Sequence, residues 1–440
     1  MPTLKPSEVH AMLRRHSMVA GHPLVLDLEH SRGLLLRDAL SGAEYLDFAS
    51  FYASNALGFH HPRLETPEVR ERLLQSALVK VGNPEFYTSE LASFVHALER
   101  IAAPETHPHY FFVEGGALAV ENAMKTAMDW KVRKNLARGL PEIGTEVLHF
   151  EHAFHGRAGY TLSVTNTDPA KTLYFPKFDW PRVPSPAAHF PLDGDNLERT
   201  QGAESAAIAA IERAFDQRPH RICAILLEPI QGEGGDRHFR AEFLQALRRI
   251  ADSREALLIF DEVQTGVGVT GNFWAHEYAG IRPDIICFAK KLQLGGFFAS
   301  TRIDDVDNVF KVPSRISSTW GGGLVDMVRA TYILETIADE RLVENAAQRG
   351  HELLQGLHAL GADFPQQMSN VRGRGLLCAF DLETPGERAE LVKACYAEQL
   401  LVLPGGPHSV RLRPPLVVNS DEVASALARL RRVLEQLAKR

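Results

Sequence analysis

Long apolar runs, paired cysteines and an excess of basic charge are all missing from this chain of 440 residues. No apolar run approaches the roughly 18 residues of a membrane-spanning helix, so we expect no membrane segment. The formal net charge of −7 argues against nucleic acid as the main partner, because phosphate binding needs a basic face. The segment Met1–His10 lacks the apolar core of a secretory signal, and we therefore expect a cytoplasmic protein.

Cysteine is scarce, with four residues and no Cys-x-x-Cys pair. Cys223, Cys287 and Cys378 lie within strand-like runs, where a free thiol behaves as a small hydrophobic group. A reduced protein is the simple interpretation. The histidine pairs at 60–61 and 152–155 have no matching cysteines and no His-Glu-x-x-His helix, so the sequence predicts no metal site.

The order of segments indicates two domains, as expected for a chain longer than one ordinary core. Strand-like and helix-like segments alternate from Tyr110 to about Ser300, which is typical of an α/β domain with a parallel sheet. We predict a large domain over residues 66–319 and a smaller α+β domain formed by residues 1–65 and 320–440.

Individual elements follow from apolar periodicity and from turn residues. In the large domain we expect strands over 110–113, 147–150, 222–227 and 256–261, with helices over 117–135 and 240–253. In the smaller domain we expect helices over 326–346, 351–360 and 421–437, with strands over 374–380 and 400–403.

Polar residues stand at the ends of three successive strand-like segments, namely Glu228, Asp261 and Lys290. The carboxyl ends of parallel strands line the ligand crevice of an open α/β sheet. A carboxylate at one strand end and a lysine at the next suit a cofactor with a basic ring nitrogen and a reactive aldehyde. Pyridoxal phosphate is such a cofactor, since its lysine forms a Schiff base and its ring nitrogen needs an acidic partner.

Lys290 has a lysine neighbour, Lys291, and a pair of solvated surface lysines is the common explanation of such a dipeptide. On an extended strand the two side chains point in opposite directions, so one can face the crevice while the other faces out. Burial beside an apolar run lowers the pKa of a lysine and makes its amine nucleophilic.

Two further segments supply groups that a phosphorylated aromatic ligand needs. In Glu114–Asn122, the turn Gly115-Gly116 and the helix start at Ala117 would point free N–H groups at a phosphate, although a plain tight turn has the same pattern. In His152–Arg157, Phe154 or His155 could stack on a flat ring and Arg157 could bind a carboxylate, unless this is a surface loop.

Four more residues are candidates for ligand contacts. Glu233, surrounded by glycines, could be a mobile acid that masks or exposes an arginine, and Gln264 could bind a ring hydroxyl or the substrate. Thr319 offers a hydroxyl to a phosphate, and Arg413 could be a second carboxylate clamp, although strand arginines are usually just solvated.

Over nearly its whole length the chain resembles the class III (ω-) aminotransferases of fold type I. The Asp261–Gly266 segment marks the class, and the other supporting stretches are more similar to the lysine ε-aminotransferases within it. The four other stretches are Phe111–Asn122, Phe175–Arg182, Glu228–Arg240 and Val410–Leu416, and the class segment lies within Leu258–Gly266. The resemblance implies an α/β fold with a mainly parallel seven-stranded sheet in the large domain and a smaller α+β domain.

The resemblance also implies a role for each cofactor-binding residue. Lys290 would form the Schiff base with pyridoxal phosphate, and Asp261 would face the pyridine nitrogen. Gly116 and Ala117 would donate backbone N–H groups to the phosphate. Thr319 would reach the same phosphate from the partner subunit of a homodimer.

For the remaining residues the resemblance implies contacts with the ring and the substrates. Phe154 would stack on the ring and Gln264 would contact the side of its hydroxyl. Arg157 and Arg413 would hold substrate carboxylates. Glu233 would pair with Arg413 while the donor is bound, so that L-lysine and 2-oxoglutarate can use one site.

Three positions depart from the family pattern and concern the amino donor. The family has asparagines where Ser317 and Gly323 stand, and lysine enzymes commonly have a smaller residue where Tyr52 stands. The expected reaction transfers the ε-amino group of L-lysine to 2-oxoglutarate, giving 2-aminoadipate 6-semialdehyde and glutamate. The alternatives are another ω-amine donor such as ornithine, 4-aminobutyrate or a diamine, a mutase or epimerase, and a non-catalytic structural subunit.

Overall fold

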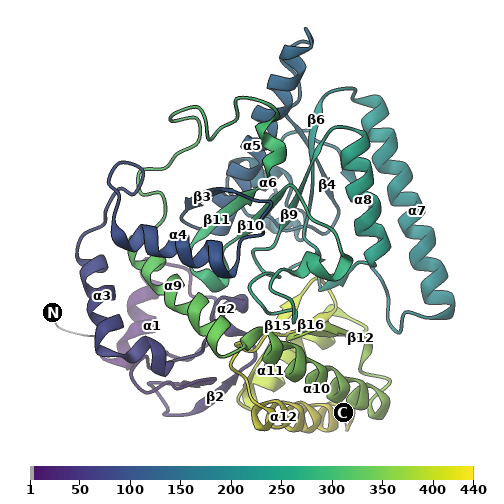
Figure 1. Cartoon of the computed structure of the whole chain (residues 1–440). Coiled ribbons are helices and arrows are strands. Elements are labelled where there is room, and N and C mark those ends of the chain that lie inside the picture. The colour runs from purple at the N-terminus through teal and green to yellow at the C-terminus, as the bar shows by residue number, and fades with distance from the viewer. Residues whose placement is uncertain (1–3, 440) are drawn as a thin grey trace.

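A seven-stranded sheet forms the centre of the large part of the molecule in the computed structural model, which describes residues 4–439 (Figure 1). The strand order is β3-β11-β10-β9-β6-β4-β5, and β11 is antiparallel to both of its neighbours. The predicted mainly parallel sheet is therefore confirmed. The strands are β3 His109–Val113, β4 Glu146–Phe150, β5 Arg182–Val183, β6 Ile222–Leu227, β9 Leu257–Asp261, β10 Ile285–Phe288 and β11 Gly295–Ala299.

The three central strands β6, β9 and β10 are buried along their whole length. Helices cover both faces of such a sheet, which explains why these strands are continuous apolar runs. Because β6, β9 and β10 are parallel neighbours, the residues that end or follow them meet at one edge of the sheet.

Helices pack beside this sheet, with α7 and α8 running side by side in Figure 1. Helix α5 packs on the sheet through contacts with β6, β10 and β11. Helices α5 and α8 confirm the two expected helices of the large domain, whereas the sequence-based expectations contain no counterpart of α7. The bounds are α5 Gly116–Ala137, α7 Gly194–Gln217 and α8 Ala241–Ser253.

The expected break between the first two helices of the smaller domain is wrong. Helix α9 spans Leu324–Asp339 and helix α10 spans Leu342–Asp363, so the break lies at residues 340–341 rather than 347–350, and Arg341 has φ 54°. Gly350 lies inside α10 rather than in a break. A Cβ there would lie 2.1 Å from the Gly375 carbonyl, so glycine permits this close packing.

The expected single strand over 374–380 is also wrong. The chain forms a hairpin instead, with β12 over Ser369–Arg374 and β13 over Leu377–Asp381, and Gly375 makes the turn with φ 55°. The 400–403 segment divides into β14, Leu400–Leu401, and β15, Leu403–Gly405.

The smaller part contains a four-stranded sheet of order β12-β13-β16-β15 and a three-stranded sheet of order β1-β2-β14. The parallel pairing of β2 with β14 joins the N-terminal stretch to the C-terminal part, while the exact domain division remains a prediction. The closing helix is confirmed as α12, with Asn419 accepting a hydrogen bond from Glu422 N at 2.9 Å. The bounds are β1 Leu35–Arg37, β2 Glu44–Asp47, β16 Ser409–Leu412 and α12 Ser420–Ala438.

The remaining helices and a short hairpin complete the described residues: α1 Pro6–Arg14, α2 Ser50–Ala53, α3 Pro67–Leu78, α4 Ser89–Ile101, α6 Gly159–Ser163, α11 Pro385–Ala397, β7 Ile230–Gln231 and β8 Arg237–His238. Among residues 4–439, no helix has the length and apolar character needed to cross a membrane. All four cysteines are buried and free.

His149, in β4, makes the stability of the fold depend on pH. Its Nε2 accepts a hydrogen bond from Arg182 Nε at 3.2 Å, and burial lowers its pKa from 6.5 to about 3. The unfolded chain therefore binds the proton first, so stability is lost as pH falls below about 6.5. We expect His149→Gln to reduce the loss of unfolding free energy between pH 7 and pH 5 by about 2 kcal/mol. Urea unfolding at both pH values measures this, and an equal loss in both proteins would contradict it.

Candidate active site

A cavity of about 750 Å³ lies at the carboxyl ends of β6, β9 and β10. Its volume is within the usual range for ligand sites. Of the site residues predicted from sequence, Thr319 and Arg413 are not among those that line the cavity. The predicted residues that do line it are Gly116, Ala117, Phe154, His155, Arg157, Glu233, Asp261, Gln264 and Lys290.

Asp261 ends β9 as a buried carboxylate with two partners. Its Oδ2 lies 2.8 Å from His155 Nδ1, and its Oδ1 accepts a hydrogen bond from Val263 N at 3.0 Å. These contacts fix the orientation of the carboxyl group. His155, predicted as one of two possible stacking residues, therefore lies against the edge of Asp261 and positions it.

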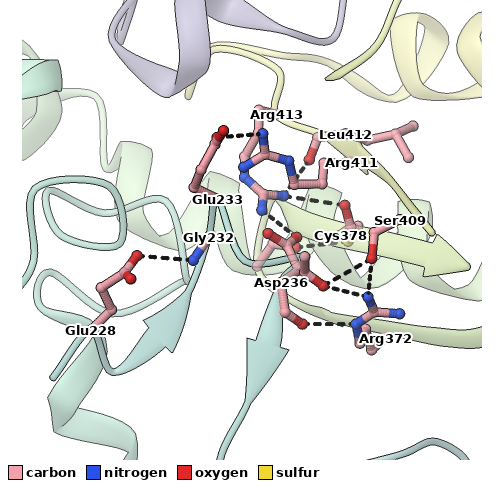
Figure 2. A network of polar contacts seen from close by, with 12 residues as sticks. Glu228, Gly232, Glu233, Asp236, Arg372, Cys378, Ser409, Arg411, Leu412 and Arg413 are labelled. Atoms are coloured by element: carbon pink, nitrogen blue, oxygen red, sulfur yellow. Dashed lines mark hydrogen bonds and ion pairs between the residues drawn. The ribbon is translucent and has the colours of Figure 1, made fainter. Parts of the chain in front are cut away.

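Glu228, which follows β6, connects two loops of the site. Its carboxylate accepts hydrogen bonds from Phe154 N at 2.9 Å and from Gly232 N at 3.1 Å, the second of which appears in Figure 2. Burial raises the pKa of Glu228 to about 7. The residue therefore holds the Phe154 loop next to the segment that carries Glu233.

Lys290 lies two residues beyond β10 and lines the cavity. Burial lowers the pKa of its amine, and that amine has no hydrogen-bond or ion-pair partner among residues 4–439. The expected extended strand is wrong here, because Lys290–Leu292 forms a 3-10 turn. Lys291 is buried rather than facing out, and it donates to Gln264 O at 2.7 Å.

Helix α5 begins at the cavity, with Gly116 and Ala117 among the lining residues. The first N–H groups of a helix have no partner within it, and the helix dipole favours an anion at this end. Gly295 of β11 lies so close that a Cβ there would be 2.3 Å from Gly115 O. The arrangement would suit a phosphate, and the phosphate contact of Gly116 and Ala117 stays a prediction.

Gln264 and Gly232 meet at another side of the cavity. A Cβ at position 232 would lie 1.7 Å from Gln264 Oε1, so a larger residue there would displace the Gln264 side chain. Within the described part of the chain, Gln264 Oε1 is buried without a hydrogen-bond partner. An unpartnered buried oxygen costs free energy, and a hydroxyl from a ligand would satisfy it.

These groups fit pyridoxal phosphate. The helix start matches the phosphate, Asp261 matches the ring nitrogen, the unpartnered Gln264 oxygen matches the ring hydroxyl, and the Lys290 amine matches the aldehyde. Phe154 lines the same cavity as a flat face for the ring. Thr319 is exposed on this chain, so its predicted contact from a partner subunit stays a prediction.

Glu233 carries its carboxylate between two cations. Its Oε1 lies 2.7 Å from Lys171 Nζ, and its Oε2 lies 3.3 Å from Arg411 Nη2. Burial alone would raise the pKa of Glu233, but Arg411 and Lys171 hold it below its usual value. The carboxylate is therefore ionised, and it pairs with Nη2 of the buried Arg411.

The predicted pair of Glu233 with Arg413 is wrong. Arg413 is completely buried and pairs with Asp236, which is also completely buried (Figure 2). Arg413 also donates to Cys378 O at 3.1 Å, away from the cavity. A buried arginine needs a counter-charge, and Asp236 supplies it. Arg411, two residues earlier, makes the contact with Glu233 instead.

Arg372 holds the backbone of the same loop, as Figure 2 also shows. It donates to Asp236 O at 2.7 Å and to Ser409 Oγ at 2.8 Å, and it pairs with Asp381 at 2.8 Å. Sequence reasoning did not identify Arg372, Arg411, Asp236 or Lys171. The sequence contains two nearby arginines in one segment and the two acids Glu233 and Asp236 in another. This pattern does not indicate which arginine pairs with which acid.

Arg157 is the other predicted carboxylate clamp. It lines the cavity, and its guanidinium carbon lies 5.9 Å from the centre of the Phe154 ring. Among residues 4–439 its guanidinium has no hydrogen bond and no ion pair. Arg157 is thus available to a carboxylate, whereas Arg411 is covered by Glu233.

The turn that carries Tyr52 has an uncommon backbone. All four residues of α2 are left-handed, with φ from 39° to 64°, and Phe51 and Tyr52 line the cavity. Each such residue costs roughly 1–2 kcal/mol. Asp47 Oδ1 accepts from Ser50 N at 2.7 Å, and Ser50 Oγ donates to Arg413 O. These bonds hold the turn, so the backbone that carries Tyr52 is anchored at the cavity.

The chain belongs to the class III aminotransferases, whose family model, Aminotransferase class-III, matches residues 17–434. The enzymes of this class depend on pyridoxal phosphate, for which the cavity has the matching groups.

Among curated relatives, the chain is 50% identical to the L-lysine-epsilon aminotransferase of Mycobacterium tuberculosis, over 98% of this chain and 96% of the relative. It is 46% identical to the L-lysine-epsilon aminotransferase of Streptomyces clavuligerus, over 97% and 94%. It is 32% identical to the mitochondrial 4-aminobutyrate aminotransferase of Homo sapiens, over 88% and 80%. The solved lysine aminotransferase from M. tuberculosis in the internal aldimine form matches with a TM-score of 0.97 and 49% identity, covering 99% of this chain and 100% of the other.

Proposed function

We propose that this enzyme transfers the ε-amino group of L-lysine to 2-oxoglutarate, giving 2-aminoadipate 6-semialdehyde and glutamate. The observation that carries the proposal is the pairing of Glu233, which lines the cavity, with the buried Arg411 behind it, while the unpaired Arg157 lines the same cavity. One arginine is available and one is masked, which suits a site that must bind a donor with one carboxylate and an acceptor with two. The names of the relatives at 46–50% identity support lysine as the donor.

In the first half-reaction, Arg157 binds the carboxylate of L-lysine by a two-pronged hydrogen bond. Glu233 stays on Arg411, which keeps a second carboxylate-binding group from competing. The ε-amino group then lies at the Lys290 end of the cavity, and the α-amino group stays remote from it. In the second half-reaction Glu233 leaves Arg411, and the two arginines bind the two carboxylates of 2-oxoglutarate.

The chemistry depends on residues at the strand ends. Bound pyridoxal phosphate supplies an electron sink for the carbon that loses its proton. Lys290 carries the proton between the substrate carbon and the cofactor carbon, and its lowered pKa keeps the amine available as a base. Asp261, held by His155, keeps the ring nitrogen protonated.

We also infer a cytoplasmic homodimer. Thr319 is exposed and lies outside the cavity of its own chain, which suits a contact with the phosphate in a partner subunit. The four buried, free cysteines suit a reducing compartment.

Isotope transfer tests the reaction directly. With L-lysine labelled with nitrogen-15 at the ε position, we expect the label in glutamate, and with α-labelled lysine we expect none. Omitting 2-oxoglutarate should stop turnover, whereas a mutase or epimerase would continue. Transfer of the α label, or a strong preference for 4-aminobutyrate, ornithine or a diamine over lysine, would contradict the proposal.

A further inference from the structure

Lys171 is a third cation beside the substrate cavity, and it lies outside every motif that the sequence indicated. It ends the 3-10 turn Pro169–Lys171 in the proline-containing excursion between β4 and α7. Its side chain is 13% exposed, and its Nζ lies 2.7 Å from Glu233 Oε1 and 3.1 Å from Thr167 Oγ1. The same amine lies 5.2 Å from the centre of the Phe154 ring.

We propose that Lys171 is the alternative counter-ion of Glu233, a positioning residue that retains this carboxylate when Arg411 is released to a dicarboxylate acceptor. The inference rests on the proposed function, in which Glu233 leaves Arg411 during the second half-reaction. Lys171 would thereby help to determine how readily the site accepts 2-oxoglutarate after it has accepted lysine.

The two oxygens of the Glu233 carboxylate contact different cations. Oε1 faces Lys171 and Oε2 faces Arg411, so each cation holds a different oxygen. The Lys171 contact is the shorter, at 2.7 Å against 3.3 Å. A rotation that breaks the contact with Arg411 can therefore keep the contact with Lys171.

The cost of exposing Arg411 depends on what Glu233 contacts afterwards. The Glu233 side chain is only 30% exposed, and burial opposes its charge. Without Lys171, a carboxylate that left Arg411 would lose its last counter-charge in a partly dry site. In the resting state without Lys171, the Glu233 carboxylate would also lie closer to Arg411, because no other cation would hold its Oε1. Both effects make Arg411 harder to release.

Removing Lys171 should therefore weaken the binding of the acceptor, 2-oxoglutarate, and leave the binding of the donor, lysine, nearly unchanged. We expect Lys171→Met to raise the KM for 2-oxoglutarate about tenfold, as expected for the loss of one charged hydrogen bond, and to leave the KM for lysine within about twofold. Lys171→Arg should restore most of the acceptor affinity because it keeps the charge. Lys177→Met is the matched control, since Lys177 is an exposed lysine of the same excursion that donates to Thr172 O.

A double substitution separates this role from direct binding of the acceptor by Lys171. In a Glu233→Ala background there is no carboxylate to retain, so Lys171→Met should leave the KM for 2-oxoglutarate unchanged. A tenfold rise that persists in this background would overturn the proposal. An equal rise in the KM for lysine and for 2-oxoglutarate in the single variant would also overturn it.

Binding of unreactive carboxylates tests Lys171 whichever amine is the donor. Titration of the holoenzyme with glutarate, followed by its visible absorbance, should show binding about tenfold weaker in Lys171→Met than in the wild type. Butyrate, with one carboxylate, should bind both proteins equally. Equal glutarate binding would overturn the role of Lys171, whereas failure of the labelled-lysine assay with weakened glutarate binding would contradict the donor assignment alone.

Discussion

Lys290→Ala is expected to lower product formation by about 10³-fold or more and to remove the visible absorbance of the bound cofactor. Lys290 is the only lysine among the residues that line the cavity at the ends of β6, β9 and β10, within the described chain. No other amine there can hold the aldehyde or move the proton. A small external amine such as methylamine should restore part of the activity, because it replaces the missing base without the side chain.

Lys291→Ala is the matched control for that experiment. Lys291 is buried and donates to Gln264 O, so its loss should lower stability while the absorbance of the cofactor remains. Absorbance retained in Lys290→Ala and lost in Lys291→Ala would show that the wrong lysine has been assigned.

The second large effect is expected on stability, from Arg413→Met. Asp236 would be left completely buried without its counter-charge, and we expect a loss of about 3–5 kcal/mol in the free energy of unfolding. The hydrogen bond from Ser50 Oγ to the backbone carbonyl of residue 413 does not depend on the side chain, so the expected loss comes from Asp236. Denaturant unfolding of the purified variant measures the loss.

Arg411→Met is the comparison that separates an effect on stability from an effect on binding of the acceptor. Glu233 would keep Lys171 as a partner and remain partly exposed, so we expect a much smaller loss of stability than in Arg413→Met. The KM for 2-oxoglutarate should instead rise by about 10²-fold, since a charged two-pronged contact is removed. If Arg413→Met instead lost acceptor affinity and kept its stability, Arg413 would be the carboxylate clamp, as predicted from the sequence.

The strand-end residues could be predicted because their positions follow from the strands themselves. Buried parallel strands are continuous apolar runs, and their carboxyl ends meet at one edge, so Glu228, Asp261 and Lys290 had to lie together. The start of α5 followed in the same way from a strand, two glycines and a helix. These inferences need only local sequence.

The contacts of the Glu233 loop could not be predicted, because they join distant segments. Arg411 and Glu233 are 178 residues apart, and Lys171 and Glu233 are 62 apart. The sequence shows two arginines, separated by one residue, and two acids, separated by two. In the folded protein Asp236 pairs with Arg413 and Glu233 pairs with Arg411, and both arginines are buried.

The left-handed turn of α2 escaped prediction for a similar reason. Positive φ is not preferred by any of the residue types in this turn, which consists of Ser50, Phe51, Tyr52 and Ala53. Rules based on local sequence therefore do not predict a left-handed conformation for them. Hydrogen bonds from Ser50 N to Asp47 Oδ1 and from Ser50 Oγ to Arg413 O impose the conformation. The continuation of α10 through Gly350 likewise involves close packing on Gly375, which no local pattern reveals.

The most direct test of the account is chemical labelling of the lysine that binds the cofactor. Borohydride reduction of the purified holoenzyme, followed by proteolysis and tandem mass spectrometry, should place the pyridoxyl label on Lys290. A label on Lys291, on another lysine, or on no peptide would contradict the account.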